Sequence, residues 1–262
     1  MSPIDLGFES FVFFLLIFAR LMGVFVQAPL FGRPQGIPMP AQICYGLGIS
    51  FLIFHTLPLP PHLPTGLMET AIDAAGQAAI GLMIGFTSYL VVAGVQFAGE
   101  MCDIQMGLSI AAMVNPATGQ PINLIASFEQ KLGILSWLFI RGYVFFFRAI
   151  KRSYQLIPVY GFTINGPALT KLIQSSGSIF SMALEISAPV LVALFITQIA
   201  LGLLNRAAQQ FNVFMISFPL NILVGLSLLL LSIVPMFYLA IPHLWRHMDK
   251  NIASLIMDLR RR

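Results

Sequence analysis

The sequence has 262 residues, of which 58% are hydrophobic and only 9% are charged. Soluble domains carry roughly 25% charged residues, so this composition excludes an ordinary soluble domain and is typical of a chain with several membrane helices. The formal net charge of +4 rests on too few basic residues for a nucleic-acid surface, because such a surface needs a dense patch of Lys and Arg.

Six apolar segments follow one another along the chain, at about residues 8–31, 40–57, 67–101, 122–147, 178–204 and 211–241. Most reach the roughly 20 residues that a bilayer-spanning helix needs, and the third is long enough to tilt or to extend beyond the lipid. Prolines interrupt the first two connections, because proline lacks an N–H group and disfavours helix at the preceding residue. Residues 166–177 are expected to form a short, more polar helix. The sequence therefore predicts an all-α integral membrane protein.

The basic residues predict how the chain is oriented. With six spans and a cytoplasmic N-terminus, the inner loops and tail hold nine Lys and Arg residues, and the outer loops hold two. This distribution follows the positive-inside rule and places the C-terminus in the cytoplasm. The tail, residues 243–262, repeats apolar residues at helical spacing opposite a basic face. It is expected to be an amphipathic helix that lies on the membrane or docks a partner.

Several charged residues lie inside apolar segments, among them Arg20 and Glu185. A charge in lipid costs several kcal/mol, roughly 2.5 to above 10, so such groups must face protein, water or an opposite charge. They indicate either an ion or substrate path, or ion pairs between helices or subunits. We favour pairing, because the charges are scattered and form no proton-relay cluster. Gly81 and Gly85 form a GxxxG pattern, which lets two helix backbones approach closely.

No sequence motif predicts catalysis. The chain has no HExxH, GxSxG or GxxxxGK[ST] pattern. His243 and His247 have helical spacing, but no carboxylate or Cys completes a metal-ligand set with them. We therefore expect no enzyme activity, no metal and no cofactor.

Three stretches together resemble the FliR family of flagellar biosynthetic proteins. They are PLFGRPQGIP (29–38) following Arg20, AGEMCDIQMGLSIAAMVNP (98–116), and EISAPVLVALFITQIALGLLNRAAQQFNVFMISFPLNILVG (185–225). The positions that fit the family pattern in the last stretch are Glu185, Pro189, Gly202, Arg206, Gln210, Asn212, Val213, Phe214, Phe218 and Pro219. Gln209, Asn221 and Asn115 depart from it. The resemblance extends over essentially the whole chain.

The resemblance implies a subunit of the flagellar type III protein-export gate. Residues 1–262 would form a single export-gate domain of bent helical hairpins, within a helical assembly that also contains FliP and FliQ. FlhB and FlhA would be further partners, and unfolded flagellar proteins would pass through the gate. The complex would belong to the flagellar basal body in the bacterial inner membrane. Because subunits can bury apolar helices as lipid does, six apolar segments need not be six lipid spans.

The resemblance also implies a plug for the channel, formed by the segment after Glu100 and Asp103. Its expected residues are Met106, Gly107, Leu108, Ser109, Ile110, Ala111, Ala112, Met113, Val114, Asn115 and Pro116. Glu100 and Asp103 would anchor its base, and Arg20, Glu185 and Arg206 would contact neighbouring helices or subunits. From the residues alone, we favour an ordinary outer loop between two spans, and only the resemblance makes the plug the leading interpretation. The competing function is a small-solute secondary transporter with Arg20 or Glu185 at its binding site, but the inverted repeats of such transporters are not evident.

Overall fold

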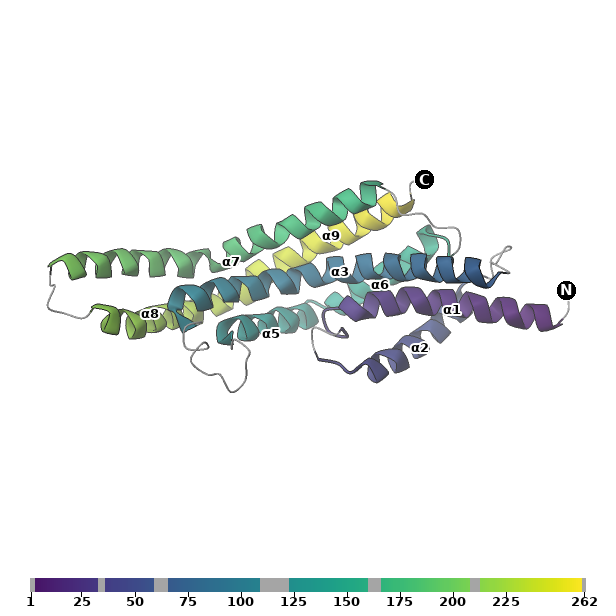
Figure 1. Ribbon diagram of the computed structural model, residues 1–262, viewed down its shortest axis with the longest axis horizontal. Coiled ribbons are helices and arrows are strands. Elements are labelled where there is room, and N and C mark those ends of the chain that lie inside the picture. Colours follow the sequence, from purple (N-terminus) through teal and green to yellow (C-terminus); the bar gives the residue numbers. More distant parts are fainter. Residues whose placement is uncertain are drawn as a thin grey trace. The chain divides into compact units, whose positions relative to one another are not determined.

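A computed structural model describes residues 3–32, 36–58, 66–108, 123–159, 166–207 and 213–260. Within these ranges the chain contains helices and no strand, so the predicted all-α class is confirmed. The helices are α1 (Pro3–Gln27), α2 (Met39–Thr56), α3 (Leu67–Met106), α5 (Leu124–Phe139), α6 (Gly142–Leu156), α7 (Gly166–Ala207), α8 (Val213–Pro235), the π-helical turn η2 (Met236–Ala240) and α9 (Ile241–Arg260) (Figure 1).

Two of the helices end directly before a proline, and the sequence predicts the first of these ends. Leu57, which follows α2, is extended at φ −99° and ψ 136° and precedes Pro58. Ile157, which follows α6, is extended at φ −115° and ψ 117° and precedes Pro158. The helical conformation is disfavoured for a residue before proline because its backbone meets the proline ring. Both helix ends are therefore determined by the proline that follows them in the sequence.

Two sequence expectations on helix boundaries are wrong. The apolar segment 122–147 is not one helix, because α5 and α6 meet at a bend of 73°. Arg141 lies between them in the left-handed region, at φ 57°. Residues 166–177 are not a separate short helix, because α7 runs unbroken through them and past Pro189. Gly142 begins α6 directly after the turn, but the positive φ lies on Arg141, where the residue type does not predict it.

Four stretches of helix are long and apolar enough to cross a membrane, within the described ranges. They are Glu9–Gln27, Leu67–Met106, Gly166–Ala207 and Met215–Leu259, and the bent pair α5–α6 brings the number to at most five. The segment 40–57 forms α2, which is not among them, so six spans is too many. Helix α3, with 40 residues, is about 60 Å long at 1.5 Å per residue, twice the hydrocarbon thickness.

Contacts divide the chain into two compact units, which are described separately. Unit 1 contains Met1–Leu90, Arg141–Ser176 and Arg246–Arg262. Unit 2 contains Val91–Ile140 and Gly177–Trp245. In unit 1, α1 packs against α2 and against the first half of α3 (Figure 1). Each unit is thus assembled from segments that are far apart in the sequence.

Small residues bring the backbones of α1 and α3 into direct contact. A Cβ atom added at Gly81 would collide with the backbone oxygen of Arg20, and one added at Gly85 would collide with that of Val24. A Cβ atom at Gly23, on the facing side, would lie 2.9 Å from the backbone nitrogen of Leu82. The GxxxG pattern therefore lies at a helix–helix contact inside this chain.

Helix α9 carries the predicted amphipathic pattern, but its apolar face is buried within the chain. The side chains concerned are each at most 5% exposed: Leu244, Met248, Ile252, Leu255 and Leu259. The structure therefore does not leave this face open for a membrane surface or a docking partner. Arg246 and Lys250, two basic residues of the same helix, are exposed.

The α1–α3 contact predicts that Gly81→Ala destabilises the full-length chain. The new methyl group cannot fit against the Arg20 backbone, and overpacking of this kind costs about 1–3 kcal/mol. Gly48→Ala is the matched control, because nothing lies within 4 Å of the position that its new methyl group would take, and alanine favours helix by about 1 kcal/mol. Thermal unfolding in mild detergent, followed by circular dichroism, measures both. Equal melting of Gly81→Ala and the parent chain would contradict the contact.

Candidate functional site

Arg20 lies at the centre of unit 1 and is completely buried. Its Nε donates to Gln77 Oε1 at 2.7 Å, and its Nη2 donates to the backbone oxygens of Ile157 and Pro158 at 3.3 and 3.2 Å. The guanidinium also lies over the Tyr154 ring, 4.4 Å from its centroid. It thus joins α1 to α3, to α6 and to the chain that follows α6.

Every acceptor that the structure gives this guanidinium is neutral. Nη1 has a further neutral partner, the Ser153 hydroxyl at 3.4 Å. The carboxylate partner that we expected for Arg20 is not among these contacts. A guanidinium suits such a place, because its charge is delocalised and its five donors form a fixed planar fork. The arrangement leaves no donor face open to a solute, and this argues against a transport site at Arg20.

Asp103 lies near the end of α3 in unit 2 and caps the start of α5. It is 1% exposed, and its two carboxylate oxygens accept the backbone N–H groups of Ile125 and Ala126 at 3.1 and 3.0 Å. Asn123, the residue just before α5, makes no capping bond with its own side chain. A carboxylate there satisfies free N–H groups and interacts favourably with the helix dipole. Asp103 therefore fixes the two flanks of residues 109–122 beside each other.

A close backbone approach reinforces this junction. A Cβ atom added at Gly99 would lie 2.5 Å from the Ala126 Cα. Glu100 takes part through side chains, since Gln96 donates to its carboxylate at 3.1 Å and itself accepts from Gln130 at 2.8 Å. Helices α3 and α5 are thus joined by backbone contact, by a cap and by an amide network.

The end of α3 is packed into an apolar cluster. Met106 is fully buried. The other buried residues of its cluster are Cys102, Ile125, Val190, Leu194 and Leu229. Gly107 follows at φ 81°, a conformation that glycine adopts without a steric cost, and its N–H donates to the Ile104 oxygen at 3.0 Å. Met106 and Gly107 therefore form the fixed base of the expected plug segment. The expected plug residues Ser109–Pro116 lie outside the described residues, and Leu108 is half-buried against the cluster.

Glu129 is a buried charged residue that the sequence analysis did not include in the site. It is 2% exposed on α5, one turn beyond the end that Asp103 caps, and its Oε2 atom has no hydrogen-bond partner within the described structure. An unsatisfied buried carboxylate is costly unless it is protonated or paired. The sequence feature that could have identified Glu129 is a carboxylate about one turn into an apolar segment.

Glu185 and Arg206 are not brought together with these groups. Both are exposed on α7, and 21 positions along a helix separate them by about 31 Å. The structure of the single chain thus buries Arg20 and Asp103 and leaves Glu185 and Arg206 on its surface.

Comparisons with known proteins identify the family. The family model of bacterial export proteins, family 1, matches residues 11–248. The chain belongs to this family. FliR, the flagellar biosynthetic protein of Bacillus subtilis (strain 168), is 31% identical over 97% of this chain and 95% of its own length. The FliR protein of Escherichia coli (strain K12) is 29% identical over 92% of this chain and 91% of its own length. That of Caulobacter vibrioides is 29% identical over 83% and 87%.

Family membership confirms the resemblance on which the sequence analysis relied. The match over residues 11–248 includes Arg20, Asp103, Glu185 and Arg206 and covers parts of both units. The small-solute transporter, which we kept as an alternative, is not favoured by these findings.

The cap on α5 predicts that Asp103→Ala destabilises the chain. Removing the carboxylate leaves the buried N–H groups of Ile125 and Ala126 without partners, which costs about 1–3 kcal/mol. Glu185→Ala is the control, because that carboxylate is exposed and its loss should change stability by less than about 0.5 kcal/mol. Thermal unfolding of the isolated chain in mild detergent measures the difference. Equal effects of the two substitutions would show that Asp103 is not a structural cap.

Proposed function

We propose that this chain is a non-enzymatic subunit of the flagellar type III protein-export gate, in the bacterial inner membrane. The observation that carries the proposal is the family match over residues 11–248, supported by FliR relatives that cover nearly the whole chain. The partners would be FliP and FliQ in the gate, with FlhB and FlhA beside it. Unfolded flagellar proteins would be the exported cargo. The C-terminus would face the cytoplasm.

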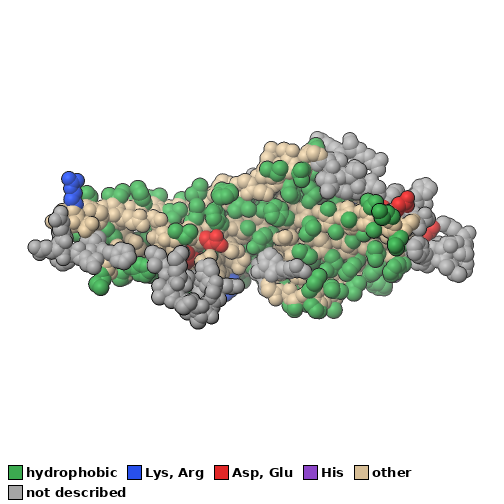
Figure 2. Space-filling view, in the orientation of Figure 1, with side chains coloured by type: hydrophobic (Ala, Val, Ile, Leu, Met, Phe, Trp, Pro, Cys, Tyr) green, Lys and Arg blue, Asp and Glu red, His purple; other side chains and the backbone are tan. Residues whose placement is uncertain are grey.

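Exposed apolar surface supports a role within an assembly. The apolar windows of α7 and of Met215–Leu259 have only 33% and 11% of their residues buried inside the chain, against 67% for α3. Apolar side chains cover much of the described surface drawn in Figure 2, and charged ones are few (Figure 2). Lipid or neighbouring subunits must cover these faces. Because Glu185 and Arg206 lie on exposed α7, partner subunits would supply their polar contacts.

The segment 107–120 would close the channel until cargo arrives. The fixed base at Met106, Gly107 and Asp103 supports this proposal, because it holds both flanks of the segment at one place in unit 2. An uncharged constriction with apolar residues such as Ile110 and Met113 would resist ion flow by excluding water. Gly107 would allow the change of direction at the base.

Assembly tests the gate directly. Co-expressed with FliP and FliQ, the chain is expected to elute in mild detergent as one large complex with both. Glu185→Gln should lower the yield of that complex by about tenfold or more, because truncating one partner of a buried charge pair costs at least 2 kcal/mol. Glu69→Gln, an exposed carboxylate at the start of α3, should have no effect. Recovery of the chain only as a monomer, or as a carrier that binds a small solute, would contradict the gate.

Permeability tests the plug. Deleting Ile110–Val114 should make membranes that contain the assembled gate leaky to small ions, because the apolar constriction is lost. Deleting the five residues Pro60–Pro64, between α2 and α3, is a control of equal size. Ion flux is compared only for gates shown to be assembled by co-purification. Tight membranes with the first deletion would exclude residues 110–114 as the plug.

A further inference from the structure

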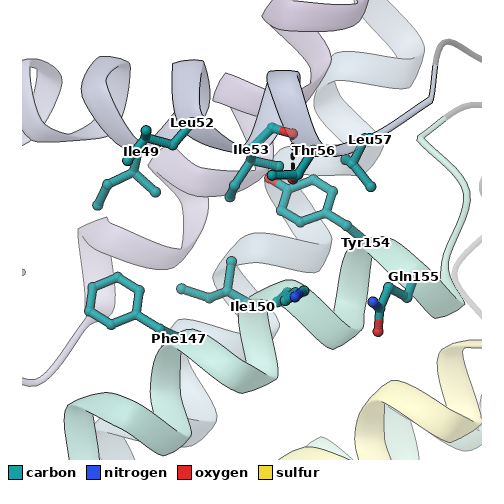
Figure 3. A pocket seen from close by; sticks show the side chains of 10 residues that line it. Ile49, Leu52, Ile53, Thr56, Leu57, Phe147, Ile150, Tyr154 and Gln155 are labelled. Carbon is teal, nitrogen blue, oxygen red and sulfur yellow. Dashed lines mark hydrogen bonds between the residues drawn. The ribbon is translucent and has the colours of Figure 1, made fainter.

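A pocket of about 430 Å³ opens between α2 and α6 within unit 1. Its α2 side consists mainly of Ile49, Leu52 and Ile53, and its α6 side of Phe147, Ile150 and Tyr154. Figure 3 shows these side chains facing one another across the space between the two helices. The volume lies within the range of about 300–1,000 Å³ that is usual for ligand sites. The pocket can therefore hold an apolar ligand or part of one.

The walls of this pocket are held by contacts on their far sides. Tyr154 donates from its hydroxyl to the Ile17 oxygen at 2.8 Å, and its ring lies under the Arg20 guanidinium. On α2, the Phe54 ring packs against Phe13, with 5.8 Å between the centroids. Because both walls are fixed to α1, the space between them is formed before any ligand arrives.

The polar edge of the pocket is cationic. Lys151 lines it together with Gln155 and Thr56, and the Thr56 hydroxyl is already used, since it donates to the Ile53 oxygen at 2.8 Å. Arg148 and Arg152 are exposed on α6 three residues before and one residue after Lys151. Neither α2 nor α6 contains an Asp or Glu residue. The edge therefore favours an anion.

An apolar space beside a cationic edge matches one class of membrane ligand. Helix α6 has an apolar face and a basic face, which is typical of helices at the membrane interface. Lys and Arg residues near a membrane surface attract anionic lipid headgroups, at about 1 kcal/mol each. A free phosphate would leave the apolar lining unused, whereas an acyl chain would fill it.

We propose that the α2–α6 pocket binds an anionic phospholipid, with an acyl chain between the two helices and the headgroup phosphate at Lys151. This site does not depend on the export-gate proposal, since it needs only that the chain lies in a membrane. The lipid would cover apolar side chains of α2, which the chain itself leaves open.

The test is a lipid titration of the purified full-length chain in mild detergent, read by native mass spectrometry. Phosphatidylglycerol and phosphatidylcholine with identical acyl chains are the two probes. The parent chain is expected to retain one phosphatidylglycerol about fivefold more tightly than phosphatidylcholine, the equivalent of one favourable charge contact. Lys151→Gln should abolish that preference, and Lys131→Gln, an exposed lysine on α5, should keep it.

A second pair of variants tests the apolar part of the site. Ile53→Trp should fill the pocket and lower the retention of both lipids about tenfold, whereas Ile43→Trp, on the exposed side of α2, should leave it unchanged. Circular dichroism and gel filtration establish that the variants are folded. Equal retention of the two lipids by the parent chain would overturn the proposal, as would full phosphatidylglycerol binding by both Lys151→Gln and Ile53→Trp. Loss of the lipid on assembly with FliP and FliQ would also overturn it and assign the pocket to a partner subunit.

Discussion

The close contact between α1 and α3 is the constraint on which unit 1 depends. Gly81 faces the backbone of Arg20, and Gly85 faces that of Val24, so the two helices advance in the same direction with four residues between contacts. Gln77 precedes Gly81 by four residues and thus shares its helix face. The glycine allows the backbones to touch, and the glutamine then meets the Arg20 side chain. A larger residue at position 81 would move Arg20 away from its acceptors and leave a charge buried without partners.

The sequence predicted those features of the fold that neighbouring residues determine, and it missed those that tertiary contacts determine. Apolar segments and proline positions predicted α1, α2 and the helix end at Leu57, because those features are decided within a few residues. The bend at Arg141 was missed, since a positive φ at arginine has no local signal. The sequence also indicated that Arg20 must be satisfied. It offered no means of choosing neutral groups on α3 and α6 over a carboxylate, because that choice is made by tertiary contact.

In unit 2, the junction of α3 and α5 likewise combines a feature that the sequence predicted with one that it did not. The gap between the apolar segments 67–101 and 122–147 predicted a break, but nothing local pairs Asp103 with the start of a helix more than twenty residues later. Two buried carboxylates at this junction differ in their hydrogen bonding. Asp103 accepts two backbone N–H groups, whereas one oxygen of Glu129 has no hydrogen-bond partner within the described ranges. Contacts within unit 2 fix the two flanks of the segment 109–122. In the plug that we propose, such a base would hold both ends of the segment.

The remaining apolar surface determines what kinds of neighbour the chain needs. The apolar window of α3 has 67% of its residues buried within the chain, whereas those of α7 and of Met215–Leu259 have only 33% and 11%. The buried Arg20 in unit 1 is satisfied within the chain, but exposed Glu185 and Arg206 on α7 are not suited to lipid. The same helix therefore favours a protein neighbour over lipid on the faces that carry these charges. Around α2 and α6 the situation is reversed, because a cationic edge beside an apolar pocket suits an anionic lipid. In the two proposals together, protein and lipid would cover different faces of one chain, each according to where its charges lie.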